Sequence, residues 1–173
     1  PSLEYVQLHM ASGTLNETVG KALATMPHLI SLEIEVNESF PIWPLVTSRS
    51  LTVLSVVSTQ FWWEMKHILP MADRLERNEV LRVLDLEPAL SCEGLKIIVA
   101  SLRSAARCEN SASLETFQFN CHAQDVEKGD ESVHELLELV ATSKQLRVVW
   151  NHSYQSFVVG RRSHTVTLAK IHE

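Results

Sequence analysis

The chain has 173 residues, enough for one domain with its own hydrophobic core. Its hydrophobic content of 45% is ordinary for a folded protein, and no apolar run approaches the roughly 18 residues that a membrane-spanning helix needs. The net charge is -6 and the fifteen basic residues are scattered, which argues against a nucleic-acid surface. We therefore expect neither nucleic acid nor a membrane as the partner.

The pattern L-x-x-L-x-L opens the chain and recurs along it. Residues two apart share one face of an extended strand, so each copy predicts a strand with one buried face. The copies start at Leu3, Leu29, Leu51, Leu81, Leu114 and Leu146. Their next two apolar positions are Val6 and Leu8, Leu32 and Ile34, Leu54 and Val56, Leu84 and Leu86, Phe117 and Phe119, and, in a degraded last copy, Val149 followed by Asn151.

Most segments between these strands have the apolar spacing of a helix. The predicted helices lie in residues 14–26, 58–78, 91–102 and 130–143, with Thr14 or Asn16, Ser91, and Asp130 or Ser132 as candidate N-caps. In the second of them we expect Leu69 on the buried face and a break or kink at Pro70. Residues 38–50 carry Pro41 and Pro44 and predict an extended or 3₁₀ connection.

The C-terminal segment predicts a β-hairpin. Phe157 and Val159 alternate before the turn residues Gly160–Ser163, and Val166 and Leu168 alternate after them. A hairpin at the end of a stack would cover its open edge. We therefore divide the chain into a repeat region, residues 1–152, and a capping hairpin, residues 153–173.

The spacing of the six copies, between 22 and 33 residues, is typical of a solenoid. Stacked units bury their apolar faces against one another, so we expect an α/β leucine-rich repeat solenoid with a parallel inner sheet and helices on the convex side of a curved arc. The chain begins at Pro1, inside a copy of the pattern, and we expect a fragment of a longer protein.

The stretch LRVLDLEPALSCEGLKIIVASL, residues 81–102, resembles the leucine-rich repeat family, most closely its ribonuclease-inhibitor-like subclass. The resemblance covers about residues 1–152, and the uneven spacing resembles the irregular repeats of F-box and immune-receptor proteins. It implies a macromolecular partner bound on the concave face. One implied function is substrate recognition in an F-box ubiquitin ligase; the alternative is a secreted or host-delivered effector or immune receptor.

Alternation assigns the concave surface, because residues flanking the second apolar position point away from the core. The predicted protein-binding residues are Tyr5, Gln7, Glu33, Glu35, Val53, Ser55, Val57, Asp85, Glu87, Gln118 and Trp150. Val148 is assigned to the same surface. Its acidic and partly apolar character suits a basic protein or peptide. The competing interpretation is a solvated sheet face with no partner.

Two further features carry open alternatives. Either Trp62 and Trp63 pack in the core, or one of them marks a contact site on the convex side. The three cysteines lack a metal-binding spacing and suit a reducing, cytoplasmic location, whereas three N-x-[ST] sequons, at Asn16, Asn37 and Asn151, favour a secreted one.

An α/β enzyme is the third hypothesis, and the sequence gives it little support. Cys121 and His122 are adjacent and point apart in an extended chain, so they make a poor nucleophile–base pair. No phosphate-binding loop, nucleophile elbow or zinc motif occurs in the sequence. We expect no catalytic residues, no cofactor and no metal site.

Overall fold

The computed structural model describes residues 4–9, 16–36, 40–57, 63–107, 114–121, 131–143, 146–152, 155–162 and 165–171. The strands are β1 (Tyr5–His9), β2 (Ser31–Glu35), β3 (Val53–Val57), β4 (Val83–Leu90), β5 (Thr116–Cys121), β6 (Arg147–His152), β7 (Gln155–Arg162) and β8 (Thr165–Ile171). The helices are α1 (Glu17–Ala24), α2 (Trp43–Val46), α3 (Met65–Leu75), α4 (Cys92–Arg107) and α6 (Glu131–Thr142).

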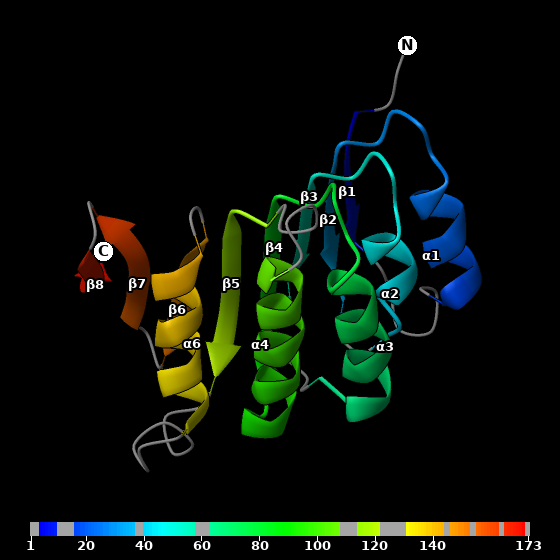
Figure 1. Cartoon of the computed structure of the whole chain (residues 1–173). Helices are drawn as coiled ribbons and strands as arrows, with labels where there is room; N and C mark the ends of the chain where they lie inside the picture. The colour runs from blue at the N-terminus through cyan, green and yellow to red at the C-terminus, as the bar shows by residue number, and fades with distance from the viewer. Residues whose placement is uncertain are drawn as a thin grey trace.

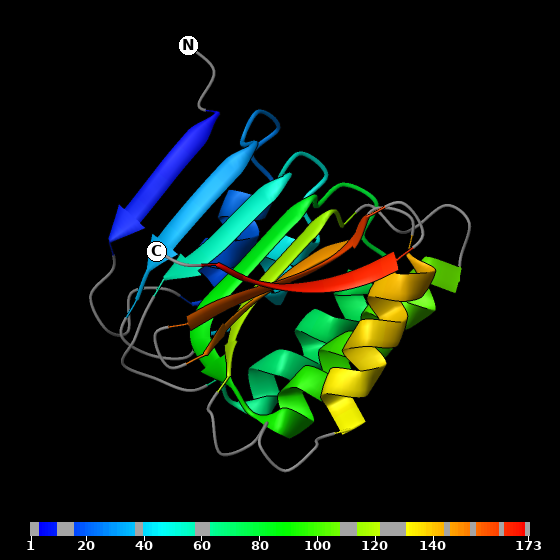
Figure 2. The same ribbon diagram turned by 90° about the vertical axis from the view of Figure 1, so that its left-hand side faces the viewer.

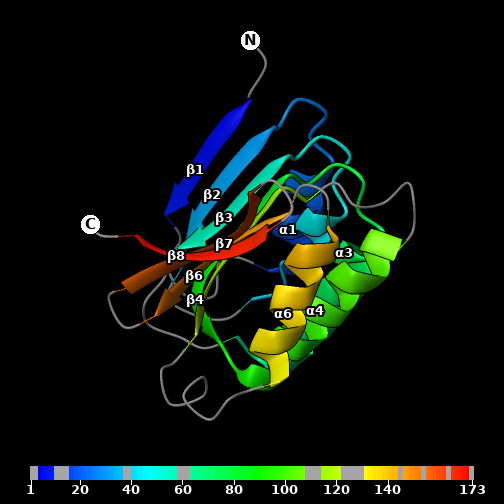
Figure 3. The ribbon, with the colours of Figure 1, turned by 60° about the vertical axis from the view of Figure 1, so that its left-hand side comes forward.

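All eight strands form one sheet in sequential order (Figure 1). Strands β1 to β6 are parallel, and a described helix lies in the connection between each neighbouring pair. Figures 2 and 3 show the helices gathered on one face of this sheet, with β1, β2 and β3 side by side. The predicted α/β class with a parallel sheet and alternating helices is confirmed.

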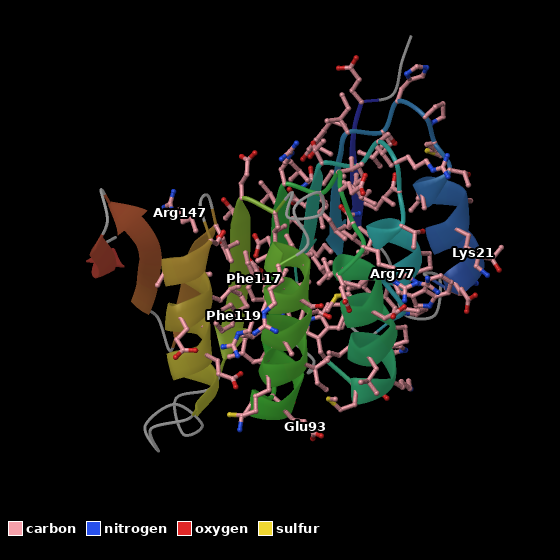
Figure 4. The ribbon with its side chains drawn as sticks, in the orientation of Figure 1. Lys21, Arg77, Glu93, Phe117, Phe119 and Arg147 are labelled. Atoms are coloured by element: carbon pink, nitrogen blue, oxygen red, sulfur yellow. The ribbon has the colours of Figure 1, made fainter. Side chains whose placement is uncertain are left out.

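The core lies between the sheet and the helices. In β2 to β5 the residues at the second and third apolar positions are at most 1% exposed: Leu32, Ile34, Leu54, Val56, Leu84, Leu86, Phe117 and Phe119. Ile68 of α3 and Ile98 of α4 are fully buried against the same cluster. Phe117 and Phe119 stack with ring centroids 5.1 Å apart, on the strand beside α4 (Figure 4).

A backbone hydrogen-bond pattern recurs at the start of β2, β3, β4 and β5. The carbonyl of Glu4 accepts the N–H groups of Ile30 and Ser31, each at 2.9 Å. The carbonyls of Ile30, Thr52 and Arg82 accept the corresponding pairs of N–H groups from the next strand, at 2.7–3.1 Å. Both lone pairs of one carbonyl are thus used at each step, which fixes neighbouring strands at the same level.

A side-chain cap also recurs, three residues before the first leucine of a copy. Asn78 Oδ1 accepts from the N–H groups of Val80 and Leu81 at 2.8 and 2.6 Å, and Asn78 Nδ2 donates to the carbonyl of Val46 at 2.5 Å. Ser48 Oγ and Ser143 Oγ accept from the N–H groups of their leucines, Leu51 and Leu146, at 3.2 and 3.1 Å. These caps satisfy donors that the turn would otherwise leave unpaired.

The connections differ from the predictions at two places. Residues 43–46 form the single α-helical turn α2, because Pro44 lies in the first turn, where no intrahelical N–H is needed. Helix α3 continues through Pro70, and Leu69 is 52% exposed rather than buried. Its buried stripe instead follows Ile68, Met71, Ala72 and Leu75, the spacing of one helical face.

The caps of two other helices agree with the sequence. Asn16 Oδ1 accepts from the N–H groups of Thr18 and Val19 at the start of α1, and Ser91 Oγ accepts from Gly94 N at 3.1 Å at the start of α4.

Pro88 lies buried within β4, where the pairing with β5 shifts between Leu86 and Ala89. A bulge tolerates the missing N–H of proline.

The predicted hairpin is confirmed, with its turn in a different place. Strands β7 and β8 pair antiparallel, and β7 also pairs antiparallel with β6. Gly160 pairs with Thr167 inside the ladder, so the reversal comes after Arg162, which pairs with Thr165. The turn itself lies outside the described residues.

The register of the sixth strand corrects the sequence assignment. Phe117 pairs with Val148 rather than Val149, and Phe119 pairs with Trp150. Val148 is fully buried, so its assignment to the inner surface is wrong. The shift follows from polarity, because the predicted register would have put Asn151 in a core row, where an unpaired amide is costly.

Candidate protein-binding face

The sheet face opposite the helices, here called the inner face, is laid out in level rows by the parallel register. One row runs across β1 to β5, and we call it the middle row: Gln7, Glu33, Ser55, Asp85 and Gln118. The row before it contains Tyr5, Val53 and Val83, and the row after it contains Glu35 and Val57. Glu87 follows Asp85 on the same face of β4, two residues further along.

Glu33 is held in place from the neighbouring strand. Gln7 Nε2 donates to Glu33 Oε1 at 2.7 Å, and Tyr5 Oη donates to Glu33 Oε2 at 3.4 Å. Cross-strand neighbours in parallel strands lie about 4.8 Å apart, which brings these side chains within reach of one another. The Glu33 carboxylate is therefore positioned rather than freely rotating.

On this face, Asp85 has a strongly raised pKa. Ser55 Oγ donates to Asp85 Oδ2 at 3.4 Å, while Oδ1 is buried and has no hydrogen-bond partner among the described residues. Burial, followed by the negative charges of Glu87 and Glu33, raises the pKa of Asp85 to about 6, while the Ser55 hydrogen bond opposes this rise. At neutral pH the Asp85 carboxylate is charged, and this charge is energetically unfavourable in its partly buried, acidic surroundings.

Glu87 shares this environment. Burial raises the pKa of Glu87, and the charges of Glu33 and Glu35 raise it as well. Neither lysine nor arginine occurs among the described inner-face residues of β1 to β5. The described inner-face residues of β1 to β5 therefore carry acidic side chains without an adjacent lysine or arginine on the same strands.

An apolar strip crosses the acidic area. Val53 and Val57 lie on β3 between the acidic positions of β2 and β4, and Val83 continues the strip on β4; all three are half-buried. Tyr5 stands at the margin of the area with 55% of its surface exposed. Apolar and aromatic contact area next to fixed charges is typical of protein-binding surfaces.

The inner-face assignments from Tyr5 to Gln118 agree with the register, and those on β6 do not. Trp150 lies level with Phe119 and not with Gln118, so the backbone register removes it from the predicted row; its side chain lies outside the described residues. Arg147, which the sequence reasoning missed, lies level with Thr116 at the start of β6 and is exposed (Figure 4). The last copy of the pattern is degraded, and for this reason the predicted register of β6 was one residue off. Comparing how many polar residues each of the two registers places in the core rows would have identified the correct one.

The tryptophans of the helix layer divide between two environments. Trp63 is 4% exposed and packs against Phe40, with ring centroids 5.9 Å apart, which confirms core packing for this member of the pair. Trp62 lies outside the described residues. Trp43 is half-buried, with Lys21 Nζ 5.4 Å and Arg74 Cζ 5.8 Å from its ring centroid. Figure 4 places Lys21 and Arg77 in this helix layer.

The described residues offer neither a metal-binding cluster nor a membrane-spanning helix. They contain no group of three or more His, Cys, Asp or Glu side chains that could hold a metal ion, so the inner-face carboxylates do not form such a group. No described helix has the length and apolar character needed to cross a bilayer.

Comparison of the chain with models of known protein families gave no match, and comparison with curated proteins gave no significant match.

Proposed function

We propose that this chain is a leucine-rich repeat solenoid of irregular, ribonuclease-inhibitor-like units that binds a protein partner on its inner face without catalysis. The observation that carries the proposal is the parallel register of β1 to β5, which is level through the middle row and spreads side chains over a sheet face that the helices leave uncovered. Such a surface suits a macromolecule better than a small molecule, which needs a concave pocket.

The strand order supports binding rather than catalysis. Open α/β enzymes place their ligands where the strand order reverses. The described strands follow the chain in sequence from β1 to β8 without such a reversal. The β7–β8 hairpin then serves as the cap that covers the last parallel strand.

Within this class we propose substrate recognition for an F-box-type ubiquitin ligase in the cytoplasm. The second candidate is a secreted or host-delivered receptor or effector. The exposed Asn16, in the first of the three sequons, favours it, because its Nδ2 lies outside the capping bonds that Oδ1 accepts. A loss of mass after glycosidase treatment of the native protein would decide for the second candidate.

Site-specific photo-crosslinking tests the binding face. A crosslinking residue is placed at Ser31 or Gln118 on the inner face, and at Asp73 or Lys96 on exposed helix positions as matched controls. In extract from the native source, we expect one protein to crosslink from both inner positions and from neither helix position. Crosslinks from the helix positions alone would refute the proposal.

Solution scattering tests the solenoid. A compact globule of this length has a radius of gyration of about 15–16 Å, and a stack of units in a curved arc exceeds it. A measured value within this compact range would contradict the arc.

A further inference from the structure

The acidic area of the inner face stores unfavourable electrostatic energy. Asp85 and Glu87 lie on β4 and Glu33 and Glu35 on β2, so the two pairs are about 10 Å apart across the valine strip of β3. Fields at this separation still overlap at physiological salt, where the screening length is about 8 Å. Cations placed over this area would relieve the repulsion.

Asp85 supplies an independent sign of a missing partner. One of its two oxygens accepts from Ser55, and the other is buried with no partner among the described residues. A buried acceptor without a donor costs free energy that a bound donor would recover. The terminal torsion of an aspartate is soft, so a small rotation would turn this oxygen toward a ligand.

We propose that the inner face over β2 to β4 binds a basic segment of the protein partner, with an arginine or lysine donating to Asp85 and a second one to Glu33. The proposal rests on the proposed function and adds the chemistry of the partner. Arginine fits best, because its guanidinium bonds a carboxylate through two parallel N–H groups. The apolar residues of the segment would contact Val53, Val57 and Tyr5.

The spacing of the carboxylates sets the spacing of the basic residues. In a polyproline II segment, residues three apart lie on the same side and about 9 Å apart. In a β-strand, residues two apart share a side and lie only about 7 Å apart. The separation of about 10 Å between the acidic pairs therefore favours basic residues at every third position.

Binding of the basic segment should depend on pH, because carboxylates of the inner face titrate. The titratable groups that face Asp85 are Glu87 on its own strand and Glu33 on β2, while β3 and β5 present Ser55 and Gln118, which do not titrate in this range. Since the pKa of Asp85 is raised to about 6, protonation removes the charge as the pH falls through that value. Binding should weaken between pH 7 and pH 5.

The experiment measures binding of a fluorescent peptide to the full chain at low salt. The probe has arginine at every third position, separated by proline and valine, and the matched control has the same composition with arginine at every second position. We expect the probe to bind more tightly than the control, and to lose affinity with added salt and below pH 6. Asp85→Asn and Glu33→Gln should each weaken binding by about tenfold, as expected for one charge-assisted hydrogen bond.

Glu93→Gln is the charge-matched control variant, since Glu93 is exposed in the first turn of α4 (Figure 4). It should change affinity less than about twofold, as a surface charge away from the site. If the wild-type chain does not bind the probe, or if Asp85→Asn binds it like wild type, the basic-segment proposal is wrong. The crosslinking result is independent of this charge test, so a partner crosslinked from Gln118 would leave the proposed function intact.

Discussion

Replacing Asp85 by asparagine should stabilise the protein at neutral pH. The pKa of Asp85 is raised from 3.8 to about 6, so the folded chain holds this proton more tightly than the unfolded chain does. Ionisation of Asp85 therefore destabilises the fold. The penalty is absent below about pH 4 and is complete once the pH has risen through 6.

The shift sets the size of the effect. At about 1.4 kcal/mol per pKa unit, it corresponds to at most about 3 kcal/mol at neutral pH. Asp85 is only partly buried, so solvent screening reduces this to about 1–2 kcal/mol. Asparagine keeps the shape and can still accept the hydrogen bond from Ser55, but it cannot ionise.

Urea unfolding of both proteins at several pH values between 4 and 8 measures the difference. We expect Asp85→Asn to match wild type near pH 4 and to exceed it by about 1–2 kcal/mol at pH 7. Asp73→Asn is the control, because Asp73 is exposed and pairs with Arg77 at 3.5 Å; it should change stability by less than about 1 kcal/mol. A difference for Asp85→Asn that does not vary with pH would refute the reasoning.

Three further variants test the fold, each by urea unfolding. Asn78→Ala loses the cap's hydrogen bonds to Val46, Val80 and Leu81 and should cost about 2–4 kcal/mol, whereas Asn78→Ser should cost about half as much, because serine still caps the leucine N–H; equal losses would contradict this. Gly94→Ala puts a Cβ 2.7 Å from Cδ1 of the buried Ile68 and should destabilise by about 1–2 kcal/mol, and a gain in stability would show that α3 yields easily. Leu84→Ala should cost about 2–5 kcal/mol, and a cost below 1 kcal/mol would place Leu84 outside the core.

The strands were predictable because burial on one face imposes a period of two. Leu84 and Leu86 lie on the core side of β4 and Asp85 on the other, as the alternation requires. The same rule predicted the inner-face rows, since parallel pairing then aligns Ser55 with Asp85. Pattern and pairing together account for the whole acidic area.

What the pattern missed depends on contacts between distant residues. The predicted register of β6 was wrong because Val148 and Val149 are equally apolar, and only the pairing with β5 distinguishes them. The Asn78 cap was missed although Ser48, Asn78 and Ser143 share one place before a leucine, because one of its bonds reaches Val46 in another unit. The raised pKa of Asp85 likewise arises from charges on two strands.

The length of a connection and the level of its strand are independent in this chain. A single helical turn, α2, joins β2 to β3, and the 16-residue α4 joins β4 to β5, yet Glu33, Ser55, Asp85 and Gln118 stay level. The side chains of the inner face thus keep their rows, with neighbouring strands about 4.8 Å apart, whatever the length of the connections. We expect an insertion or deletion in a connection to leave these rows level. Substitution of single inner-face side chains can then change the binding specificity while the helix layer varies in length.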